Sequence, residues 1–405
     1  MKVLHIQYSM PPAGNACYRL HIAMLRSGID SSVLNIERSI AVRNNVYSKS
    51  FGASAIIKKF INKKQIQYIK KKLVPDAYFY SHKPIVGADL INETIVQEAD
   101  VIYFHWVAGG CITFEEIERI AKTGKLIIFF MHDMWPFTGG CHHSFDCNGY
   151  ESGCHKCPMF KNKCNIASKQ IEAKKRIFSK YSNIIFISPS KWMAECARKS
   201  HAIKCNRVFS ISNIIDEKIF RPINKNIARD LLDLPQDKKI ITFGCQAGTN
   251  NPYKGWKYLK DAMSLLHRDD IHVVVYGVDY QKATQDQVSY PITFLGPIFD
   301  ETKLALVCNA TDVFVSPSLA ESFGLTFLEN ILCGTPVVGF DNTAIGEIIK
   351  SGVNGYLAKN KDTLDLANGI NTLLDNPKII KCENYSSCYI VEQHIQLINT
   401  IISLV

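Results

Sequence analysis

The stretch SPSLAESFGLTFLENILCGTPVV, residues 316–338, decides the fold of this chain. It follows an apolar run, residues 312–315, that has strand length and β-branched character. From Phe323 to Cys333 the apolar residues recur at mostly helical spacing, and then Gly334 ends the helix before the next apolar strand begins. The segment is therefore a strand–loop–helix–strand unit. Its loop lies at the carboxyl end of a strand, where open α/β sheets bind ligands.

Two carboxylates mark this unit. Glu321 lies in the loop, and Glu329 follows eight residues later, inside the predicted helix. Between them, the backbone N–H groups of Ser322, Phe323, Gly324 and Leu325 start the helix and suit a phosphate, which the small Gly324 lets approach closely. Glu321, the phosphate site and Glu329 could thus hold the sugar, the diphosphate and the ribose of one ligand. Taken alone, each glutamate would equally fit an ordinary charge on a solvated helix.

The whole string resembles the donor-binding signature of the retaining glycosyltransferases of family 4, which have the GT-B fold. The matching positions are Pro317, Ser318, Glu321, Phe323, Gly324, Glu329, Gly334, Pro336, Val337 and Val338. The resemblance implies that Glu321 contacts the donor sugar and that Glu329 contacts the ribose. It extends over essentially the whole chain and implies a nucleotide diphosphate-sugar, UDP- or GDP-linked, as the donor.

The length of 405 residues suits two α/β domains, each with its own core. No apolar run reaches the roughly 18 residues of a membrane span. The start MKVLHIQYSM has the pattern of a strand and not that of a secretory signal. The 14 cysteines are mostly scattered among apolar residues, which is typical of core positions in a reduced, cytoplasmic protein.

Positive charge is concentrated in the first half of the chain. Residues 1–212 carry 30 Lys and Arg against 15 Asp and Glu, whereas residues 213–405 carry 17 against 22. Between Lys58 and Lys72, lysines alternate with isoleucines, a basic amphipathic pattern suited to an anionic membrane surface. The same pattern would be tolerated by nucleic acid and also fits a solvated helix face. We expect the membrane and no nucleic acid.

The amino-terminal region begins as a strand, a loop containing Gly14, and a helix. This order is a general device for approaching a phosphate, and the resemblance implies that the Gly14 loop faces the donor. Two further strands, residues 99–106 and 125–131, end at His105 and His132. A histidine at the carboxyl end of a parallel strand projects towards a ligand cleft. We expect loop hydrogen bonds to hold His105, whereas the resemblance implies that His132 contacts the donor sugar near the reacting centre.

The insert at residues 138–164 is rich in cysteine and histidine. Cys154 and Cys157 have zinc-knuckle spacing, and Cys141 and Cys147 supply a looser second pair. Four thiolates around one structural zinc ion would fix a loop that has little apolar material. Free thiols and a redox pair are the alternatives. The segment from His132 to Cys157 also resembles a family-4 subgroup that acts in bacterial surface-polysaccharide assembly.

The second domain is expected to begin near residue 213, where residues 213–222 resemble the hinge of the family with isoleucine in place of glycine. A strand then leads to Gly244, and Lys254 precedes a second helix start that suits a diphosphate. Where the family usually has an arginine, this chain has Cys245 or Gln246. The predicted domains are 1–212, with the insert 138–164; 213–380; and a final helix at 381–405 that returns to the first domain.

The sequence thus predicts two Rossmann-like α/β domains with parallel sheets facing a central cleft. The predicted function is transfer of a sugar, with retention of configuration, to a hydroxyl of a lipid-linked glycan at the inner face of the bacterial plasma membrane. His132, Glu321 and Lys254 are the predicted catalytic residues; the predicted donor-binding residues are Gly14, Gly244, Ser322, Phe323, Gly324, Leu325 and Glu329. No catalytic metal is expected, because cations and helix dipoles would stabilise the leaving diphosphate.

Two alternatives remain open. One is a sugar-nucleotide epimerase or a glycan phosphorylase on the same fold. The other is a basic, zinc-stabilised nucleic-acid-binding protein.

Overall fold

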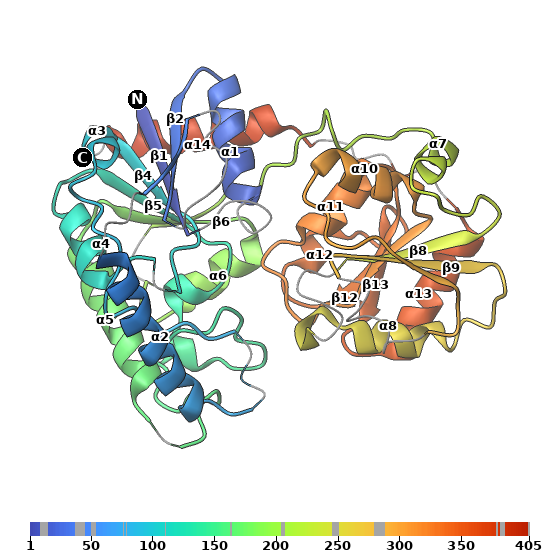
Figure 1. Cartoon of the computed structure of the whole chain (residues 1–405), viewed down its shortest axis with the longest axis horizontal. Coiled ribbons are helices and arrows are strands. Elements are labelled where there is room, and N and C mark those ends of the chain that lie inside the picture. Colours follow the sequence, from blue (N-terminus) through green and yellow to red (C-terminus); the bar gives the residue numbers. More distant parts are fainter. Residues whose placement is uncertain are drawn as a thin grey trace. The chain divides into compact units, whose positions relative to one another are not determined.

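The computed structural model divides the chain into two compact units (Figure 1). Unit 1 comprises Met1–Ile214 and Cys388–Val405, and unit 2 comprises Ile215–Ser387. The structure describes residues 1–8, 15–36, 45–49, 54–75, 77, 79–109, 111–162, 164–203, 207–244, 251–278, 288–377, 380 and 385–403.

Unit 1 is built on a seven-stranded parallel sheet with the order β3-β2-β1-β4-β5-β6-β7. The strands are β1 Lys2–Gln7, β2 Asp30–Asn35, β3 Val46–Ser48, β4 Val101–Phe104, β5 Leu126–Phe130, β6 Ile184–Ser188 and β7 Val208–Ser210. The helices are α1 Asn15–Arg26, α2 Ser54–Lys72, α3 Thr94–Glu98, α4 Phe114–Ala121, α5 Ile166–Lys180, α6 Lys191–Lys199 and α14 Ser387–Ile402, with short 3-10 turns at Trp135–Phe137 and Gly149–Glu151.

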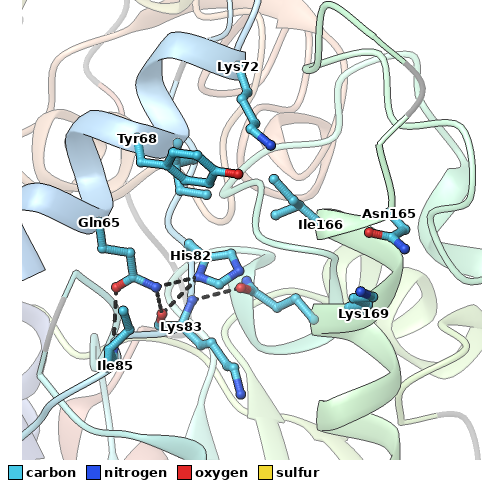
Figure 2. A pocket seen from close by; sticks show the side chains of 11 residues that line it. Gln65, Tyr68, Lys72, His82, Lys83, Ile85, Asn165, Ile166 and Lys169 are labelled. Carbon is cyan, nitrogen blue, oxygen red and sulfur yellow. Dashed lines mark hydrogen bonds between the residues drawn. The ribbon is translucent and has the colours of Figure 1, made fainter.

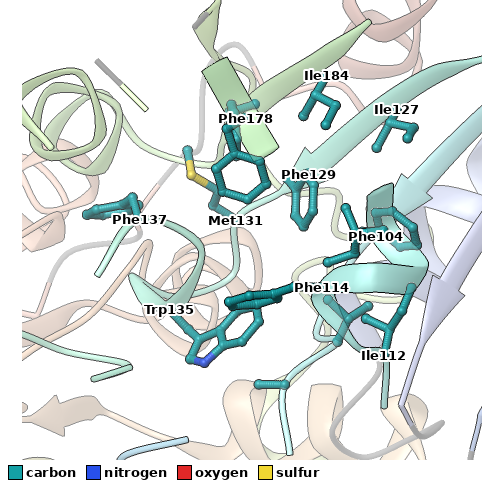
Figure 3. Packing of buried hydrophobic residues seen from close by; sticks show 14 of the residues in the cluster. Phe104, Ile112, Phe114, Ile127, Phe129, Met131, Trp135, Phe137, Phe178 and Ile184 are labelled. Atoms are coloured by element: carbon teal, nitrogen blue, oxygen red, sulfur yellow. The ribbon is translucent and has the colours of Figure 1, made fainter. Parts of the chain in front are cut away.

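The central strands are continuous apolar runs because helices cover both faces of a parallel sheet. Every residue of β4, β5 and β6 is buried. Figure 3 shows part of this core, where the ring of Trp135 lies beside that of Phe114 and the ring of Phe129 meets that of Phe178 edge-on. The sheet order reverses between β1 and β4, so residues that follow these two strands lie at a topological switch point.

Unit 2 is built on a six-stranded parallel sheet with the order β10-β9-β8-β11-β12-β13. The strands are β8 Lys239–Gly244, β9 Ile271–Tyr276, β10 Ile292–Phe294, β11 Val313–Ser316, β12 Val337–Asp341 and β13 Gly355–Lys359. The helices are α7 Lys225–Asp230, α8 Trp256–Met263, α10 Glu301–Ala310, α11 Leu325–Leu332, α12 Ile345–Ile348 and α13 Thr363–Asp375, with a 3-10 turn at Pro252–Lys254. Figure 1 shows α7, α10 and α11 on one face of this sheet and α8 and α13 on the other.

The order of this second sheet reverses between β8 and β11. Open α/β sheets bind ligands at such a point, beyond the carboxyl ends of the two strands. The segments that follow are residues 245–255 after β8 and residues 317–324 after β11. The strand–loop–helix–strand unit predicted from residues 316–338 therefore lies at the position where a ligand site is expected.

The predicted α/β class with parallel sheets is confirmed in both units. The short strands β3 and β13 and helix α4 were not predicted. Among the helices described, none is long and apolar enough to cross a membrane.

Candidate functional site

The switch point of unit 2 is closed by backbone contacts between its two loops. The N–H of Leu319, after β11, donates to the carbonyl oxygen of Tyr253, before α8, at 2.7 Å. Gly255 lies directly under the carbonyl of Pro317: an added Cβ would stand 1.9 Å from that oxygen. The φ of Gly255 is 76°, in the left-handed region that favours glycine. The two loops therefore fit each other only because residue 255 has no side chain.

Lys254 and Glu321, from the two loops, form an ion pair. Nζ of Lys254 lies 2.6 Å from Oε1 of Glu321, and the side chains are 21% and 15% exposed. The backbone N–H of Glu321 donates to Oγ1 of Thr343 at 3.0 Å, which holds the loop from the other side. Thus two of the three residues predicted to be catalytic are in contact. The ion pair orients the lysine before any ligand binds and leaves both groups partly open to solvent.

The amino terminus of α11 follows this pair directly. Its N-cap is Gly324, with a φ of 97° and no capping side chain, so the first N–H groups of the helix are not satisfied by a side-chain cap. Ser322 and Phe323 are buried, Leu325 is half-buried, and Glu329 is buried on α11. An uncapped helix start beside a lysine is a suitable environment for a phosphate.

Of the other predicted donor residues, the structure describes Gly244 but not Gly14. Gly244 is the last residue of β8 and so borders the switch point. Gly14, Cys245 and Gln246 lie outside the described residues. The structure therefore brings Lys254 and Glu321 into contact. It places Gly244 at the end of β8, and it places Ser322, Phe323, Gly324 and Leu325 at the start of α11.

In unit 1 the carboxyl ends of β4 and β5 carry a chain of histidines. Nε2 of His105 lies 2.9 Å from Nδ1 of His5, and Nδ1 of His105 lies 2.8 Å from Nε2 of His132. Burial lowers the pKa of all three imidazoles, that of His132 to about 4, so each is neutral at physiological pH. We expected loop groups to hydrogen-bond His105. That expectation is wrong, because its two ring nitrogens contact the rings of His5 and His132 instead.

The segment after His132 is fixed by a second, shorter network. Nδ1 of His142 lies 2.6 Å from Oδ2 of Asp133, and Nε2 of His142 lies 2.8 Å from the hydroxyl of Ser81. Burial opposes ionisation of Asp133, but His142 and the backbone N–H of Trp135 lower the pKa of its carboxyl below the ordinary value. The sequence analysis missed the contact between Asp133 and His142, because a separation of nine residues indicates no contact in a loop.

Lys174 of α5 is a buried lysine that the sequence analysis also missed. Its Nζ donates to the carbonyl oxygens of Trp135 and, at 2.9 Å, Thr138, and lies 4.0 Å from the centre of the Trp135 ring. Burial lowers the pKa of this amine to about 7. The lysine thereby ties α5 to the loop that follows His132.

We expect Lys174→Met to lower the free energy of unfolding by roughly 2 kcal/mol, because two buried carbonyl groups lose their donor. The pKa of Lys174 falls on folding from 10.5 to about 7. The unfolded chain therefore binds more protons between these pH values, and the contribution of Lys174 to stability grows as the pH rises through them. Chemical denaturation at about pH 6 and about pH 9 measures this, with the gap between wild type and variant widening at the higher pH. Lys169→Met, on an exposed position of α5, is the matched control. An equal effect of the two substitutions would contradict the assignment.

The predicted zinc site of Cys141, Cys147, Cys154 and Cys157 is not assembled. Four sulfur atoms around one tetrahedral zinc ion lie about 3.8 Å apart. Among the described residues, no three of these thiols have sulfur atoms that all lie within 4.8 Å of one another. Burial raises the pKa of Cys141 to about 12 and that of Cys157 to about 11.

Other contacts hold the cysteine-rich insert. Cys141 pairs with Tyr80 in an isolated antiparallel bridge, and the Tyr80 hydroxyl donates to the carbonyl of Gly139 at 2.8 Å. Cys154 is buried, and its sulfur packs against Gly139, where an added Cβ would lie 3.0 Å from it. The structure therefore does not support the zinc prediction.

Unit 1 also contains a pocket of about 520 Å³ between α2, the segment around His82 and the start of α5 (Figure 2). Its lining includes Tyr68 and Ile69 as well as Lys72, Lys83 and Lys169. Figure 2 shows Gln65 bridging to His82 and to the carbonyl of Lys83, at 2.9 Å each. A pocket that joins apolar lining to several lysines suits an anionic group attached to an apolar chain.

Comparison with known proteins finds a family match in unit 2. Residues 238–376 match the family model described as Glycosyl transferases group 1. D-inositol 3-phosphate glycosyltransferase 2 of Catenulispora acidiphila is 30% identical over 188 residues, which are 42% of this chain and 43% of that protein. The chain thus matches less than half the length of this curated relative.

Solved structures resemble the chain along its whole length. Sucrose-phosphate synthase from Thermosynechococcus elongatus has a TM-score of 0.65 at 16% identity and covers 100% of both chains. Anabaena Alr3699/HepE, solved in complex with UDP-glucose, has a TM-score of 0.64 at 16% identity and covers 99% of this chain and 100% of that one. At these identities the likeness establishes the shared fold of the two-unit chain.

Proposed function

We propose that this chain, which carries a group 1 glycosyltransferase domain at residues 238–376 and has the GT-B fold, is a retaining glycosyltransferase. It transfers a sugar from a nucleotide diphosphate-sugar to a hydroxyl group of a glycan acceptor. The observation that carries this proposal is the Lys254–Glu321 ion pair beside the uncapped start of α11, at the switch point of unit 2. The relative solved with UDP-glucose supports a nucleotide-sugar as the donor class.

Each group at the switch point has a role in this reaction. The diphosphate binds the N–H groups at the start of α11 and the ammonium of Lys254, which stabilise the charge that develops as the sugar leaves. Glu321 accepts hydrogen bonds from hydroxyls of the donor sugar, and Glu329 accepts them from the ribose. His132 of unit 1 contacts the donor sugar near the reacting carbon.

The chemical step exchanges one bond at the anomeric carbon of the sugar. The bond to the diphosphate oxygen breaks, and the bond to the acceptor oxygen forms on the same face of the ring, which retains configuration. The proton of the acceptor hydroxyl passes to the leaving diphosphate oxygen. No covalent enzyme intermediate is required.

Incubation of the purified chain with a panel of UDP- and GDP-sugars tests the donor assignment. We expect slow hydrolysis of one donor, and faster nucleotide diphosphate release when a glycan acceptor is added. The epimerase alternative predicts a changed sugar nucleotide without any acceptor. The phosphorylase alternative predicts dependence on free phosphate. If the chain releases nucleotide diphosphate from no donor, with or without acceptors, the proposed function is wrong.

We further propose that the acceptor is a lipid-linked glycan of bacterial polysaccharide synthesis and that the chain works as a peripheral protein on the inner face of the plasma membrane. Helix α2 supports this, because large apolar side chains are exposed among its lysines. Asn62 and Gln65 face the protein, donating at 2.7 and 2.9 Å to the carbonyls of Val86 and Lys83. The outward side instead exposes large apolar side chains: Ile57 is 64%, Phe60 59% and Tyr68 55% exposed.

Exposed lysines are interleaved with these apolar side chains. Nζ of Lys64 lies 5.3 Å from the centre of the Phe60 ring, and Nζ of Lys72 lies 4.4 Å from that of Tyr68. Aromatic and aliphatic groups among lysines are what an anionic bilayer surface binds. The lysine-lined pocket of Figure 2 borders the same helix and would suit the phosphate of a lipid-linked acceptor.

We expect the chain to sediment with anionic vesicles and not with neutral ones, and to be released by high salt, which screens charge. Replacement of Lys63, Lys64, Lys70, Lys71 and Lys72 with glutamine should abolish this binding, since each lysine near an anionic leaflet contributes about 1 kcal/mol. The matched control replaces five exposed lysines outside α2: Lys122, Lys156, Lys180, Lys191 and Lys199. Equal vesicle binding of the two variants would show that α2 is only a solvated face.

A further inference from the structure

The histidine chain of unit 1 has one closed end and one open end. Its closed end is His5, on β1, which is 0% exposed and whose Nε2 has no hydrogen-bond partner among the residues that the structure describes. His105, in the middle, is 4% exposed and uses both ring nitrogens in the chain. His132 is half-buried and joins the chain through Nε2, which leaves its Nδ1 for solvent or a ligand.

A chain of neutral imidazoles can be polarised in only two ways, because each ring carries one N–H donor and one acceptor nitrogen. In the outward arrangement, Nδ1 of His5 donates to His105, Nδ1 of His105 donates to His132, and the proton of His132 lies on Nδ1. In the inward arrangement all three protons move to the Nε2 atoms. The choice therefore determines whether His132 offers a donor or an acceptor.

The closed end selects the outward arrangement. Inward polarisation would leave the N–H of His5 Nε2 buried and unpaired, and orphaned buried N–H groups are rare in folded proteins. Outward polarisation leaves only a lone pair there. Cys17 lies at this end of the histidine chain: it is 1% exposed, burial raises the pKa of its thiol, and its sulfur lies within 4.8 Å of ring nitrogens of His5 and His105.

We propose that His105, backed by His5, is a positioning residue that fixes His132 in its Nδ1–H tautomer, so that His132 presents a hydrogen-bond donor to the bound sugar. The tautomer of His132 is inferred from the distances between the three histidines and from their burial. The contact between its N–H group and the sugar rests on the proposed function. No proton passes along the row of histidines, because Nε2 of His5 has no hydrogen-bond partner to exchange with among the described residues. His132 is thus a neutral donor for an oxygen of the sugar.

Nitrogen-15 NMR of the histidine rings tests the tautomer directly, without substrate. In the wild-type chain, His132 is expected to show a protonated Nδ1 and an unprotonated Nε2, with its signals assigned by their loss in His132→Asn. His105→Phe removes the donor and should shift His132 to the Nε2–H form that free imidazole side chains favour. His105→Gln, whose amide N–H can still donate, should retain the Nδ1–H form.

His394→Phe is the matched control. His394 is also buried in this core, and its ring stacks on that of Phe130, but it bonds Tyr103 and takes no part in the chain. This substitution should leave the tautomer of His132 unchanged. The proposal is overturned if wild-type His132 carries its proton on Nε2, or if His105→Phe and His394→Phe leave it equally unaffected. The wild-type spectrum decides even if the variants fold poorly.

Two further measurements distinguish the positioning role of His105 from a metal site and from a failure of the proposed function. Metal analysis of the wild-type chain should find no stoichiometric metal ion; a metal held by His5, Cys17 and His105 would occupy the ring nitrogens and overturn the proposal. With an active donor, His105→Phe should lower kcat about twofold to tenfold, the worth of one neutral hydrogen bond, and His105→Gln should restore it. If no donor is turned over at all, the proposed function fails while the NMR result still stands.

Discussion

Glu321→Gln is expected to lower kcat about 10- to 150-fold, because hydrogen bonds from sugar hydroxyls to a carboxylate are worth roughly 1.5–3 kcal/mol. The same substitution removes the ion pair with Lys254, whose Nζ lies 2.6 Å from the carboxylate. The lysine then keeps its full charge for the diphosphate, so donor binding should change little or tighten. Glutamine preserves the size of the side chain, removes its charge and replaces one acceptor oxygen with an NH2 donor.

The control is Glu347→Gln, which changes an exposed carboxylate on α12 of the same unit. Steady-state kinetics over a range of donor concentrations separates kcat from KM. Glu329→Gln should show the opposite pattern, a weaker donor affinity with little change in kcat, because the ribose does not react. Since Glu329 is buried, a thermal unfolding curve must accompany that variant. Wild-type kinetics in both Glu321→Gln and Glu329→Gln would refute the donor-site assignment.

Long periodic segments were predictable from the sequence. The strand before Ser316, the helix that contains Glu329 and the strand that opens at Val337 all appear within two residues of their predicted ends. Their apolar spacing and the stop at Gly334 are local signals that need no knowledge of the rest of the chain. The switch point follows from strand order, so the general place of the candidate site was predictable as well.

Contacts between distant residues were not predictable in the same way. His5, His105 and His132 meet because β1, β4 and β5 are neighbours in the sheet, and no spacing in the sequence shows this. Lys174 sits on a helix that has an ordinary basic composition, yet it is buried. For these residues, tertiary packing decides what the side chain does.

The cysteine pattern was misleading for a related reason. The spacing of Cys154 and Cys157 suggested a zinc knuckle, but a motif becomes a site only when its second half folds next to it, and Cys141 and Cys147 do not complete it. For α2 the sequence indicated that lysines and apolar residues share one helix, but not which of its side chains pack on the protein. The structure turns Asn62 and Gln65 towards the protein and exposes Ile57 and Phe60.

Gly255→Ala is expected to disrupt the candidate donor site more than any other single methyl group added to unit 2. The new Cβ would stand 1.9 Å from the carbonyl oxygen of Pro317, and a backbone atom cannot yield as a flexible side chain would. The loop after β11 must then move, which breaks the Leu319–Tyr253 hydrogen bond and separates Lys254 from Glu321. We expect a loss of donor affinity of more than tenfold, together with a lower melting temperature.

Gly296→Ala separates this clash from backbone strain. Gly296 has a φ of 66°, close to the 76° of Gly255, but an added Cβ there meets nothing within 4 Å. Both variants therefore carry the strain of a left-handed alanine, about 1–2 kcal/mol, and only Gly255→Ala carries the clash. Calorimetric titration of the donor and a thermal unfolding scan of both variants give the difference. If the two variants bind the donor equally well and melt at the same temperature, the close approach of the two loops does not shape the donor site.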